Sequence, residues 1–246
     1  MTIVITGGTR GIGLAIAEGL VGRGEPLLLG YHCDRGAADD AVVRLAGLGG
    51  RARAFASDIG TIDGAAALMA EAATMDEPVT GLIHSAAMIY PTTLLEADLV
   101  KFTRAVETNG LSLLYLVQKA LPLMDRGGSI VFVSSAGARA SQARYGALGT
   151  GKALAESILR YLVAELAPLG IRINAIAPGL MQTDSVASMV GGQEAADRLF
   201  ERAAKTNPSG RLTEGRDCAA VAAFLLGPDA EFIQGQVIHA NGGAYV

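Results

Sequence analysis

A glycine-rich turn near the N-terminus constrains the fold more than any other feature of this sequence. The short apolar run Ile3 to Ile5 is followed directly by the glycine cluster Thr6 to Gly13, after which Leu14 to Leu20 has helical spacing. Glycines at such a place permit a tight turn and let the backbone approach a pyrophosphate, which the helix N-terminus then faces. The order strand, glycine turn, helix therefore predicts a dinucleotide site rather than a plain glycine turn.

Apolar runs and helical patterns then alternate along the chain. Further strands are expected at Pro26–Leu29, Ala52–Ala56, Gly81–Ser85, Ser129–Ser134, Ile171–Ile176 and Gln236–Ala240. Helices are expected at Ala37–Leu48, Ile62–Ala73, Lys101–Leu121, Tyr145–Ala167 and Arg216–Leu226. This alternation implies right-handed parallel crossovers. We predict one α/β domain over residues 1–246, a Rossmann fold whose seven-stranded, mostly parallel sheet has helices on both faces.

One segment interrupts the alternation. Residues Met181 to Asn207 are longer than a usual strand-to-helix connection, and they mix apolar side chains such as Val186 and Phe200 with Gly191-Gly192. We expect segment 181–207 to be a substrate lid, and the alternative is a peripheral pair of helices.

Composition excludes several classes of protein. The 246 residues are half apolar, which is enough for one domain with a full core. With 20 basic and 24 acidic side chains, the net charge of −4 provides no basic field for nucleic acid. The sequence has no signal-peptide pattern at Met1 to Arg10, no apolar run of membrane-spanning length, and no metal-ligand spacing at Cys33 and Cys218. We therefore expect a cytoplasmic protein with no metal, nucleic-acid or membrane partner.

The end of the second expected strand bears on cofactor choice. An NAD-selective enzyme of this fold places a carboxylate there to bind the ribose diol, but this sequence has Tyr31 and His32. Arg10 in the glycine turn would meet a 2′-phosphate with positive charge. Arg35 would add a second contact, although Asp34 beside it opposes this. These residues favour NADPH over NADH.

Three residues form a candidate reactive group. Ser135 follows the fifth expected strand, and Tyr145 and Lys152 lie at the start of a long helix. A phenol is a poor acid at neutral pH, but a nearby ammonium lowers its pKa towards the useful range. Taken singly, each residue has a structural alternative: a turn serine, a half-buried tyrosine and a solvated lysine.

Two further polar residues stand within expected regular elements. Asn109 and Gly110 both disfavour the interior of the helix that is expected there. The Asn109 side chain would hold a water linked to the lysine, and the alternative is a local kink. His84 ends the fourth strand and is expected to be a hydrogen-bonded core or cofactor-edge residue without a catalytic role.

These motifs resemble the short-chain dehydrogenase/reductase family over essentially the whole chain. The turn of Thr6 to Gly13 is similar to the TGxxxGxG cofactor turn, His84 to Ala87 stands where most members have Asn-Asn-Ala-Gly, and Asn241 to Gly243 is similar to the closing Asp-Gly-Gly. The resemblance implies that Asn109 acts with Ser135, Tyr145 and Lys152, that Asp58 contacts adenine, and that the turn at Pro178 lies beside the nicotinamide. The cofactor-binding residues that it implies are Gly7, Thr9, Arg10, Gly11, Ile12, Gly13, Tyr31, His32, Asp58, Ile59, Ser85, Ala86, Lys152, Pro178, Gly179 and Thr183.

The spacing of the reactive group departs from the common family pattern. Most members carry Tyr-x-x-x-Lys, but the residue four before Lys152 is Leu148, which has no proton to give. The stretch from Tyr145 to Lys152 instead resembles the Tyr-x6-Lys pattern of bacterial enoyl-acyl carrier protein reductases. Segments 207–211 and 235–236 support this resemblance. They are similar to the closing segments of that branch of the family, which is otherwise close to 3-oxoacyl reductases. Many enoyl reductases have a second tyrosine where Ser135 stands, so ketone reduction remains a rival.

The two spacings suit different substrates. In a ketone, charge collects on an oxygen about 1.2 Å from the carbon that receives hydride, whereas in a 2-enoyl thioester the two atoms are about 3 Å or more apart. Moving the tyrosine from four to seven residues before the lysine keeps both on one helical face and shifts the phenol by up to about 4.5 Å. That shift matches the enoyl geometry.

We order three functions by preference: an NADPH-dependent enoyl-thioester reductase, a ketoreductase of 3-oxoacyl thioesters or polyketide intermediates, and a non-catalytic nucleotide-sensing scaffold. The acyl group would be carried by acyl carrier protein or coenzyme A. The family commonly pairs the helices equivalent to 101–121 and 145–167 and also its C-terminal edges, and we expect a homotetramer. Ala153, Ala155 and Ala164 would allow close packing in it.

Overall fold

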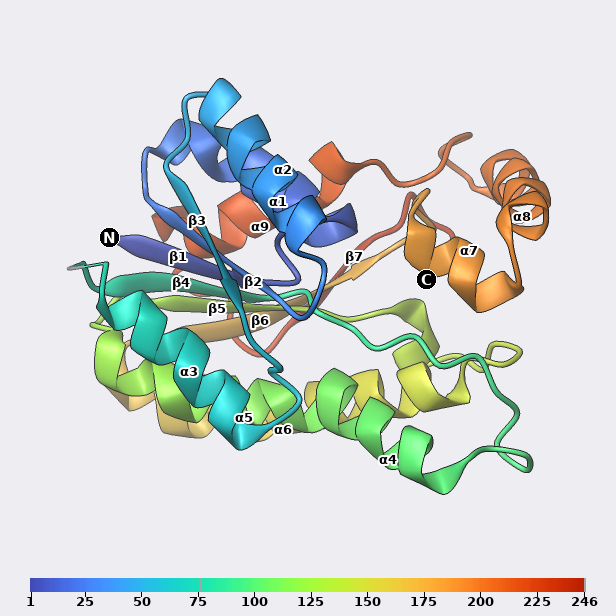
Figure 1. The fold of residues 1–246 in the computed structure, drawn as a ribbon, viewed down its shortest axis with the longest axis horizontal. Coiled ribbons are helices and arrows are strands. Elements are labelled where there is room, and N and C mark those ends of the chain that lie inside the picture. The colour runs from blue at the N-terminus through green and yellow to red at the C-terminus, as the bar shows by residue number, and fades with distance from the viewer. Residues whose placement is uncertain (76, 246) are drawn as a thin grey trace.

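Seven strands form one sheet at the centre of the molecule (Figure 1). The computed structural model describes residues 1–75 and 77–245. The strands are β1 (Thr2–Thr6), β2 (Leu27–Tyr31), β3 (Ala52–Ala56), β4 (Val79–His84), β5 (Ser129–Val133), β6 (Arg172–Pro178) and β7 (Val237–Ala240). Their order is β3-β2-β1-β4-β5-β6-β7, and each neighbouring pair is parallel. The predicted Rossmann fold is confirmed, with a sheet that is entirely rather than mostly parallel.

Helices cover both faces of the sheet (Figure 1). The helices are α1 (Gly11–Leu20), α2 (Arg35–Gly47), α3 (Ile62–Ala73), α4 (Leu99–Val106), α5 (Ser112–Ala120), α6 (Gly146–Leu166), α7 (Asp184–Val190), α8 (Gln193–Thr206) and α9 (Gly215–Leu226). Helices α1, α2 and α9 lie on one face, and α3, α5 and α6 lie on the other. The strand order reverses between β1 and β4, so the carboxyl ends of these two strands flank the crevice where doubly wound sheets bind ligands.

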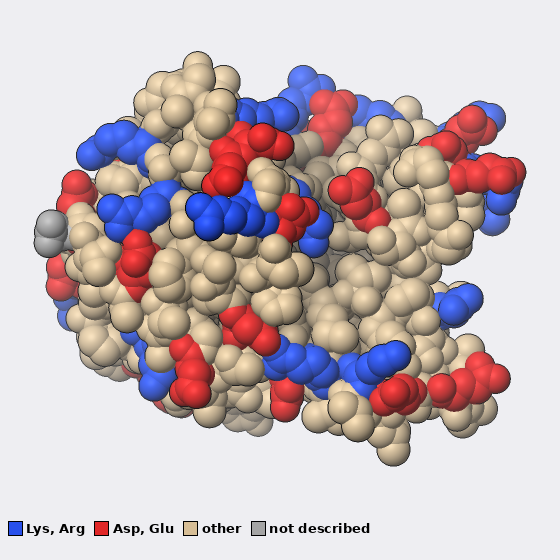
Figure 2. Space-filling model, viewed as in Figure 1, with Lys and Arg blue, Asp and Glu red and all other residues tan. Residues whose placement is uncertain are grey.

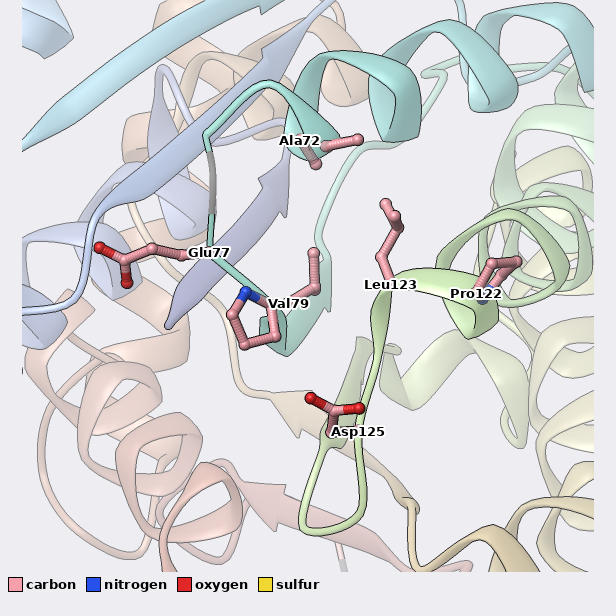
Figure 3. A pocket seen from close by; sticks show the side chains of 8 residues that line it. Ala72, Glu77, Val79, Pro122, Leu123 and Asp125 are labelled. Atoms are coloured by element: carbon pink, nitrogen blue, oxygen red, sulfur yellow. The ribbon is translucent and has the colours of Figure 1, made fainter.

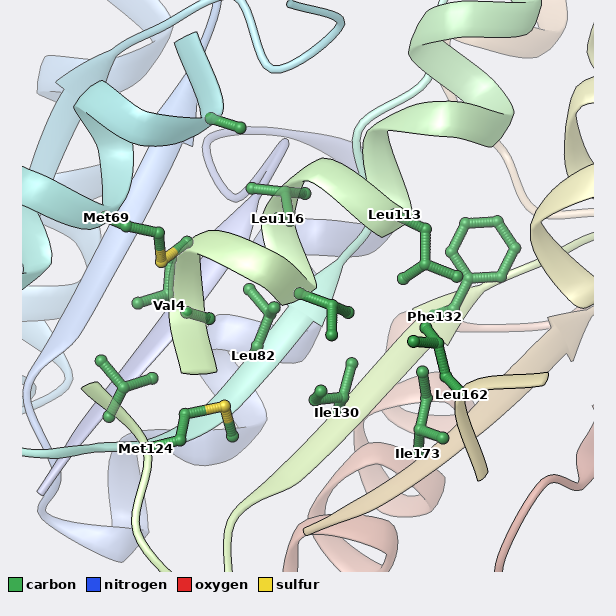
Figure 4. Close-up of a cluster of buried hydrophobic side chains, with 14 of the residues drawn as sticks. Val4, Met69, Leu82, Leu113, Leu116, Met124, Ile130, Phe132, Leu162 and Ile173 are labelled. Atoms are coloured by element: carbon green, nitrogen blue, oxygen red, sulfur yellow. The ribbon is translucent and has the colours of Figure 1, made fainter. Parts of the chain in front are cut away.

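Side chains alternate between the two layers along each strand. Val4 in β1 packs with the cluster under α3, α5 and α6, of which Figure 4 shows a part, whereas Ile3 and Ile5 pack under α1, α2 and α9. All three are at most 1% exposed. Full burial of such a side chain contributes roughly 1.5–3 kcal/mol. Burial on both faces explains why these strands are continuously apolar.

The expected helix over 101–121 is interrupted by one π-helical turn. α4 and α5 are joined by Glu107–Leu111, which has π geometry. Here α6 crosses very closely, since a Cβ on Gly110 would lie 2.8 Å from the Gly151 carbonyl oxygen, and one on Gly151 would lie 2.6 Å from Asn109 Cβ. The wide turn places Asn109 in the interior, where it is fully buried.

Segment 181–207 forms a helical hairpin of α7 and α8. Gly191 and Gly192 separate the helices with φ values of +91° and +132°, which favour glycine. Of α8, Ala196 and Phe200 are buried. The hairpin projects beyond the carboxyl ends of the strands, at the right of Figure 1.

One of the three expected interface alanines faces the core instead. Ala155 has no exposed surface and packs in the cluster under α6, because it shares the inward face of that helix with Leu159. Ala164 is exposed and Ala153 is half-buried. Only these two remain available to an α6 interface.

Among the described residues, no helix has the length and apolarity needed to cross a membrane. Over the same part of the chain, no three His, Cys, Asp or Glu side chains gather as a metal site would require.

Candidate functional site

The glycine turn leaves no room for larger residues at its two tightest points. A Cβ on Gly7 would lie 2.8 Å from Ala86 Cα, and one on Gly13 would lie 2.1 Å from the Gly7 carbonyl oxygen. Gly7 and Gly11 also have φ values of +63° and +54°. Since Gly11 to Leu14 are uncharged, the first amides of α1 meet no side-chain anion of their own turn. This cradle fits a pyrophosphate.

Residues of later strands surround this cradle. The Ala86 amide donates to Thr6 Oγ1 over 3.3 Å, and the Ser85 amide donates to the Thr6 carbonyl. The Thr183 γ-methyl group would lie 3.6 Å from a Cβ on Gly11. The structure therefore brings together the expected β1, β4 and β6 parts of the cofactor site.

Each basic side chain near the end of β2 has an acidic neighbour. Arg10 lies 3.7 Å from Asp34, and Arg35 lies 3.7 Å from Asp39. His32 Nε2 is 3.9 Å from the Asp58 carboxylate. Arg10 is still 65% exposed, so it is free to reach a ligand at the turn. Tyr31 ends β2 as expected.

Asp58 forms an ion pair with an arginine that the sequence did not identify as a site residue. Its carboxylate forms an ion pair with Arg104 of α4, which also donates to the Gly60 carbonyl over 2.8 Å and lies 3.3 Å from Glu107. Ile59 is buried beside it. Arg104 thus ties the expected adenine loop to the start of the π-helical turn.

Ser135 and Tyr145, two of the three residues of the expected reactive group, lie together at the amino end of α6. Tyr145 occupies the N-cap position of α6, and its hydroxyl lies 3.0 Å from Ser135 Oγ. Ser135 Oγ also accepts the Gly137 amide hydrogen over 3.1 Å. The tyrosine ring packs on Gly137, where a Cβ would lie 2.4 Å from Tyr145 Cε1. A hydroxyl pair held in this way is suited to bind an oxygen that gains negative charge.

Lys152 approaches from the interior. It is 4% exposed, donates to the Val133 carbonyl over 2.8 Å and lies 4.5 Å above the Phe132 ring. Burial lowers the Lys152 pKa to about 7.

The pKa of the tyrosine moves opposite to expectation. Burial raises the pKa of Tyr145, and the Ser135 hydrogen bond only partly offsets this rise. The expected lowering by Lys152 is not among the causes that act on Tyr145, and the Lys152 ammonium instead donates to the Val133 carbonyl. Leu148, four residues before the lysine, is 5% exposed and packs inward.

The Asn109 side chain is hydrogen-bonded to the loop after β4. Its Oδ1 accepts the Met88 amide hydrogen, and its Nδ2 donates to the Met88 carbonyl, both over 2.9 Å. Each amide atom can still form one further hydrogen bond, so the expected water remains a prediction. The local distortion that the sequence suggested as an alternative is present as the π-helical turn.

His84 forms a directed hydrogen-bond chain in the interior. Its Nδ1 lies 2.7 Å from Thr6 Oγ1, and its Nε2 lies 2.7 Å from Ser112 Oγ, which in turn donates to the Thr108 carbonyl. Ser112 therefore accepts from Nε2, and Nδ1 accepts from Thr6. Burial, followed by the charge of Lys152, lowers the His84 pKa well below its ordinary value. His84 is therefore a hydrogen-bonded core residue with a neutral imidazole.

A buried carboxylate behind the reactive group was not predicted. Glu156 is 4% exposed, accepts from Ser134 Oγ over 2.6 Å and pairs with Arg139 Nε at 3.1 Å. Its signal was present in the sequence, since Glu156 follows Lys152 by one helical turn and lies between the inward-facing Ala155 and Leu159.

Open space lies on more than one side of the molecule. A cavity of about 320 Å³ beside Val79 and Leu123 is at the amino ends of the strands, away from the reactive group (Figure 3). A larger groove of about 1030 Å³ runs between α1, α9 and segment 210–216 and reaches Met181. Figure 2 shows a further hollow between the α7–α8 hairpin and the part that carries α4. This hollow lies at the end of the molecule where the strands terminate.

The sequence is similar to acyl-group reductases over nearly its full length. A family model described as enoyl-(acyl carrier protein) reductase matches residues 7–245. The 1-cyclohexenylcarbonyl-CoA reductase of Streptomyces collinus is 32% identical over 242 residues, covering 98% of this chain and 85% of that protein. The 3-oxoacyl-[acyl-carrier-protein] reductase FabG of Staphylococcus aureus is 29% identical over 249 residues, covering 99% of this chain and 97% of FabG.

Solved structures have the same fold. A blue fluorescent protein from a metagenomic library, crystallised in complex with NADPH, is 28% identical with a TM-score of 0.88, covering 100% of this chain and 98% of that one. The enoyl-[acyl-carrier-protein] reductase (NADH) of Aquifex aeolicus is 26% identical with a TM-score of 0.88, covering 100% of this chain and 96% of that one.

Proposed function

This chain belongs to the short-chain dehydrogenase/reductase family, and on that basis we propose that it reduces the 2,3 double bond of a 2-enoyl thioester with NADPH. As a member of this family it is an NAD(P)H-dependent oxidoreductase, which sets aside the nucleotide-sensing scaffold. The enoyl substrate and the choice of NADPH are the proposal.

The spacing of the reactive group carries the proposal. Tyr145 stands seven residues before Lys152, and Leu148 fills the place of the nearer acid with an inward-packed side chain. The Tyr145 hydroxyl is bonded to Ser135 Oγ at 3.0 Å, so both groups are available to one substrate oxygen. A phenol at this place suits an oxygen about 3 Å or more from the hydride-accepting carbon.

The residues of the chain divide the work as follows. A bound nicotinamide would supply the hydride for the β-carbon of the substrate. The electron pair of the 2,3 double bond would then form a new bond between the α-carbon and the thioester carbon, and the carbonyl pair would move to the thioester oxygen, where the hydroxyls of Tyr145 and Ser135 stabilise the negative charge. A proton from solvent, added to the α-carbon, would restore the carbonyl and complete the reduction. Lys152 holds the end of β5 through the Val133 carbonyl, and in this proposal it would bind the nicotinamide ribose.

A ketoreductase of 3-oxoacyl thioesters is the second candidate. The Ser135–Tyr145 hydrogen bond favours it, because a serine and a tyrosine side by side would also bind a ketone oxygen. The similarity to FabG points the same way. Both candidates use an acyl thioester, carried by acyl carrier protein or coenzyme A.

Paired substrates distinguish the two candidates. Oxidation of NADPH should be followed with a 2-enoyl thioester and with the 3-oxo thioester of the same chain length and carrier. We expect the enoyl compound to saturate the enzyme and the 3-oxo compound to react at least tenfold more slowly. The opposite preference would assign ketone reduction, and no turnover of either compound would reject the proposed substrate class.

The charges near β2 support NADPH. Arg10 is exposed at the glycine turn, and β2 ends at Tyr31 rather than at a carboxylate. Asp34 lies beside Arg10, and its negative charge would oppose binding of a 2′-phosphate. The preference for NADPH therefore depends on the positive charge of Arg10.

We also propose that the α7–α8 hairpin is the substrate lid. It borders the hollow in Figure 2, and only Ala196 and Phe200 of α8 are buried. Exchanging an exposed apolar residue of the hairpin, Val190→Asp, should raise KM for a long-chain thioester more than for a short-chain one. Equal KM values in parent and variant would reject the lid.

A homotetramer is proposed from the exposed apolar side chains of two faces. Tyr161 on α6 is 78% exposed, and Phe232 before the edge strand β7 is fully exposed. Self-association would remove both from water.

A further inference from the structure

We infer that Glu156 is a positioning residue, which acts with Arg139 and Ser134 to hold the Ser135–Tyr145 pair in its reactive arrangement. The inference rests on the proposed function, in which that pair binds the substrate oxygen. Glu156 does not itself touch the pair, and no step of the proposed reaction uses its carboxylate.

The Glu156 carboxylate bonds both ends of one short turn. One oxygen accepts from Ser134 Oγ over 2.6 Å, and the other pairs with Arg139 Nε at 3.1 Å. Between these two residues lies the turn that begins at Ser135, closed by the Ala138 amide bonded to the Ser135 carbonyl over 3.0 Å. A single carboxylate therefore fixes where this turn starts and where it ends.

The same turn supports the tyrosine. Gly137 lies against the Tyr145 ring, and its amide donates to Ser135 Oγ over 3.1 Å. A Cβ on Gly149 of α6 would lie 2.6 Å from the Gly137 carbonyl oxygen, so the turn also rests directly on that helix. Any displacement of the turn would change the 3.0 Å separation of the two hydroxyls.

The burial of Glu156 makes its bonds to Ser134 and Arg139 hard to break. Its side chain is 5% exposed, whereas that of Arg139 is 55% exposed. A buried carboxylate needs its partners, because an ion that loses them keeps the full cost of desolvation. Glu156 therefore binds its partners tightly, and since it follows Lys152 by one helical turn, it links the Ser135 turn to the helix that carries the lysine.

Arg139 is the residue to substitute in a test, because its side chain is largely exposed and its replacement leaves the core packing intact. In Arg139→Gln the carboxylate keeps Ser134 but loses its cation. We expect kcat for the preferred thioester to fall about tenfold and the Tm to fall, because the buried carboxylate loses its cation, while the KM for NADPH stays nearly unchanged. The matched control is Arg160→Gln. Arg160 is an exposed arginine that follows Glu156 by one helical turn on α6, and its substitution should leave kcat unchanged.

A mutant cycle asks whether Arg139 acts through the Ser135–Tyr145 pair. In a background that lacks both hydroxyls, Ser135→Ala with Tyr145→Phe, Arg139→Gln should lower the remaining kcat by less than about twofold, because the pair that it positions is already gone. An equal tenfold loss in both backgrounds would overturn the inference, as would full activity of Arg139→Gln alone.

A measurement without substrate separates this inference from the proposed function. In protein labelled with ¹³C at tyrosine Cζ, the Tyr145 signal is identified by its loss in Tyr145→Phe. Arg139→Gln should shift this signal, and Arg160→Gln should not. If neither thioester is turned over, the proposed function fails while this shift still decides the inference. An unmoved Tyr145 signal would overturn it.

Discussion

Tyr145 is the residue on which the proposed chemistry depends most directly. Because its hydroxyl stands beside Ser135 Oγ and its ring rests on Gly137, Tyr145→Phe keeps the packing and removes only one hydroxyl. We expect kcat to fall by roughly 10²- to 10⁴-fold, the range for a lost general acid, with NADPH affinity and Tm nearly unchanged. Steady-state kinetics and fluorescence titration of NADPH test this. Full activity of the variant would defeat the mechanism for either substrate.

Arg10 and Asp34 together make a prediction about cofactor choice. Arg10→Ala should weaken NADPH binding with little effect on NADH, since only NADPH has the 2′-phosphate. Asp34→Asn should strengthen NADPH binding, because it removes a negative charge 3.7 Å from Arg10. Asparagine also keeps the N-cap oxygen that Asp34 offers to Ala37 in α2. Calorimetry of the parent and both variants with both cofactors measures the six affinities, and a parent that prefers NADH would contradict the assignment.

Lys152 should make stability depend on pH. Burial lowers its folded-state pKa to about 7 from 10.5 in the unfolded chain. Between these values the unfolded chain binds a proton that the folded protein lacks, so stability rises with pH, by at most about 1.4 kcal/mol per pH unit. Below pH 7 both states are protonated and this contribution is constant.

Urea unfolding at pH 7, 8 and 9 checks the Lys152 prediction. The free energy of unfolding of the parent should rise relative to that of Lys152→Met, whose side chain is similar in length and does not titrate. A difference that stays constant over the three pH values would contradict the prediction.

Among the elements, the segment that leads into α6 stores backbone strain. Arg144 directly precedes Tyr145 and has a φ of +59°, which residues with a Cβ rarely adopt. The Thr92 amide donates to the Arg144 carbonyl over 3.2 Å, so the loop after β4 holds this conformation. A strained residue beside a candidate acid indicates that the direction of the tyrosine matters more than local stability.

Two substitutions of Arg144 should have opposite consequences. Arg144→Gly accepts the positive φ and should retain kcat within about threefold. Arg144→Val is β-branched and should cost about 1–3 kcal/mol of stability and at least tenfold in kcat. Urea unfolding and steady-state kinetics measure both effects. Equal activity of the two variants would show that this backbone conformation does not position Tyr145.

Sequence patterns predicted the elements whose signals are local. The glycine turn and the alternating strands were identified because their residues meet only near neighbours and the two covering layers. The sequence indicated only a local kink at Asn109 and Gly110. The π-helical form of this kink could not be predicted, since it depends on the close crossing of Gly110 and Gly151, which are distant in sequence. For the same reason the Asn109–Met88 bonds and the Arg139–Glu156 pair emerged only in three dimensions.

At the scale of the whole molecule, the proposed tetramer depends on two exposed apolar side chains on different elements. The carboxyl ends of the strands face the hollow in Figure 2, whereas Tyr161 lies in the carboxyl-terminal half of α6 and Phe232 lies between α9 and β7, and both side chains are exposed. Closed assemblies commonly use two separate self-complementary faces to build a tetramer with two-fold axes. The reactive group of each subunit would then stay open to its own substrate.

The tetramer can be dissected one face at a time. Light scattering of the parent at micromolar concentration should give about four times the chain mass of 25.2 kDa. Tyr161→Asp should disrupt the α6 face and Phe232→Asp the β7 face, because each places a charge where apolar contact is expected. Each variant alone should form dimers, and the double variant should be a monomer. Since both side chains are largely exposed, neither change should unfold the subunit, so a parent that is monomeric would contradict the assembly directly.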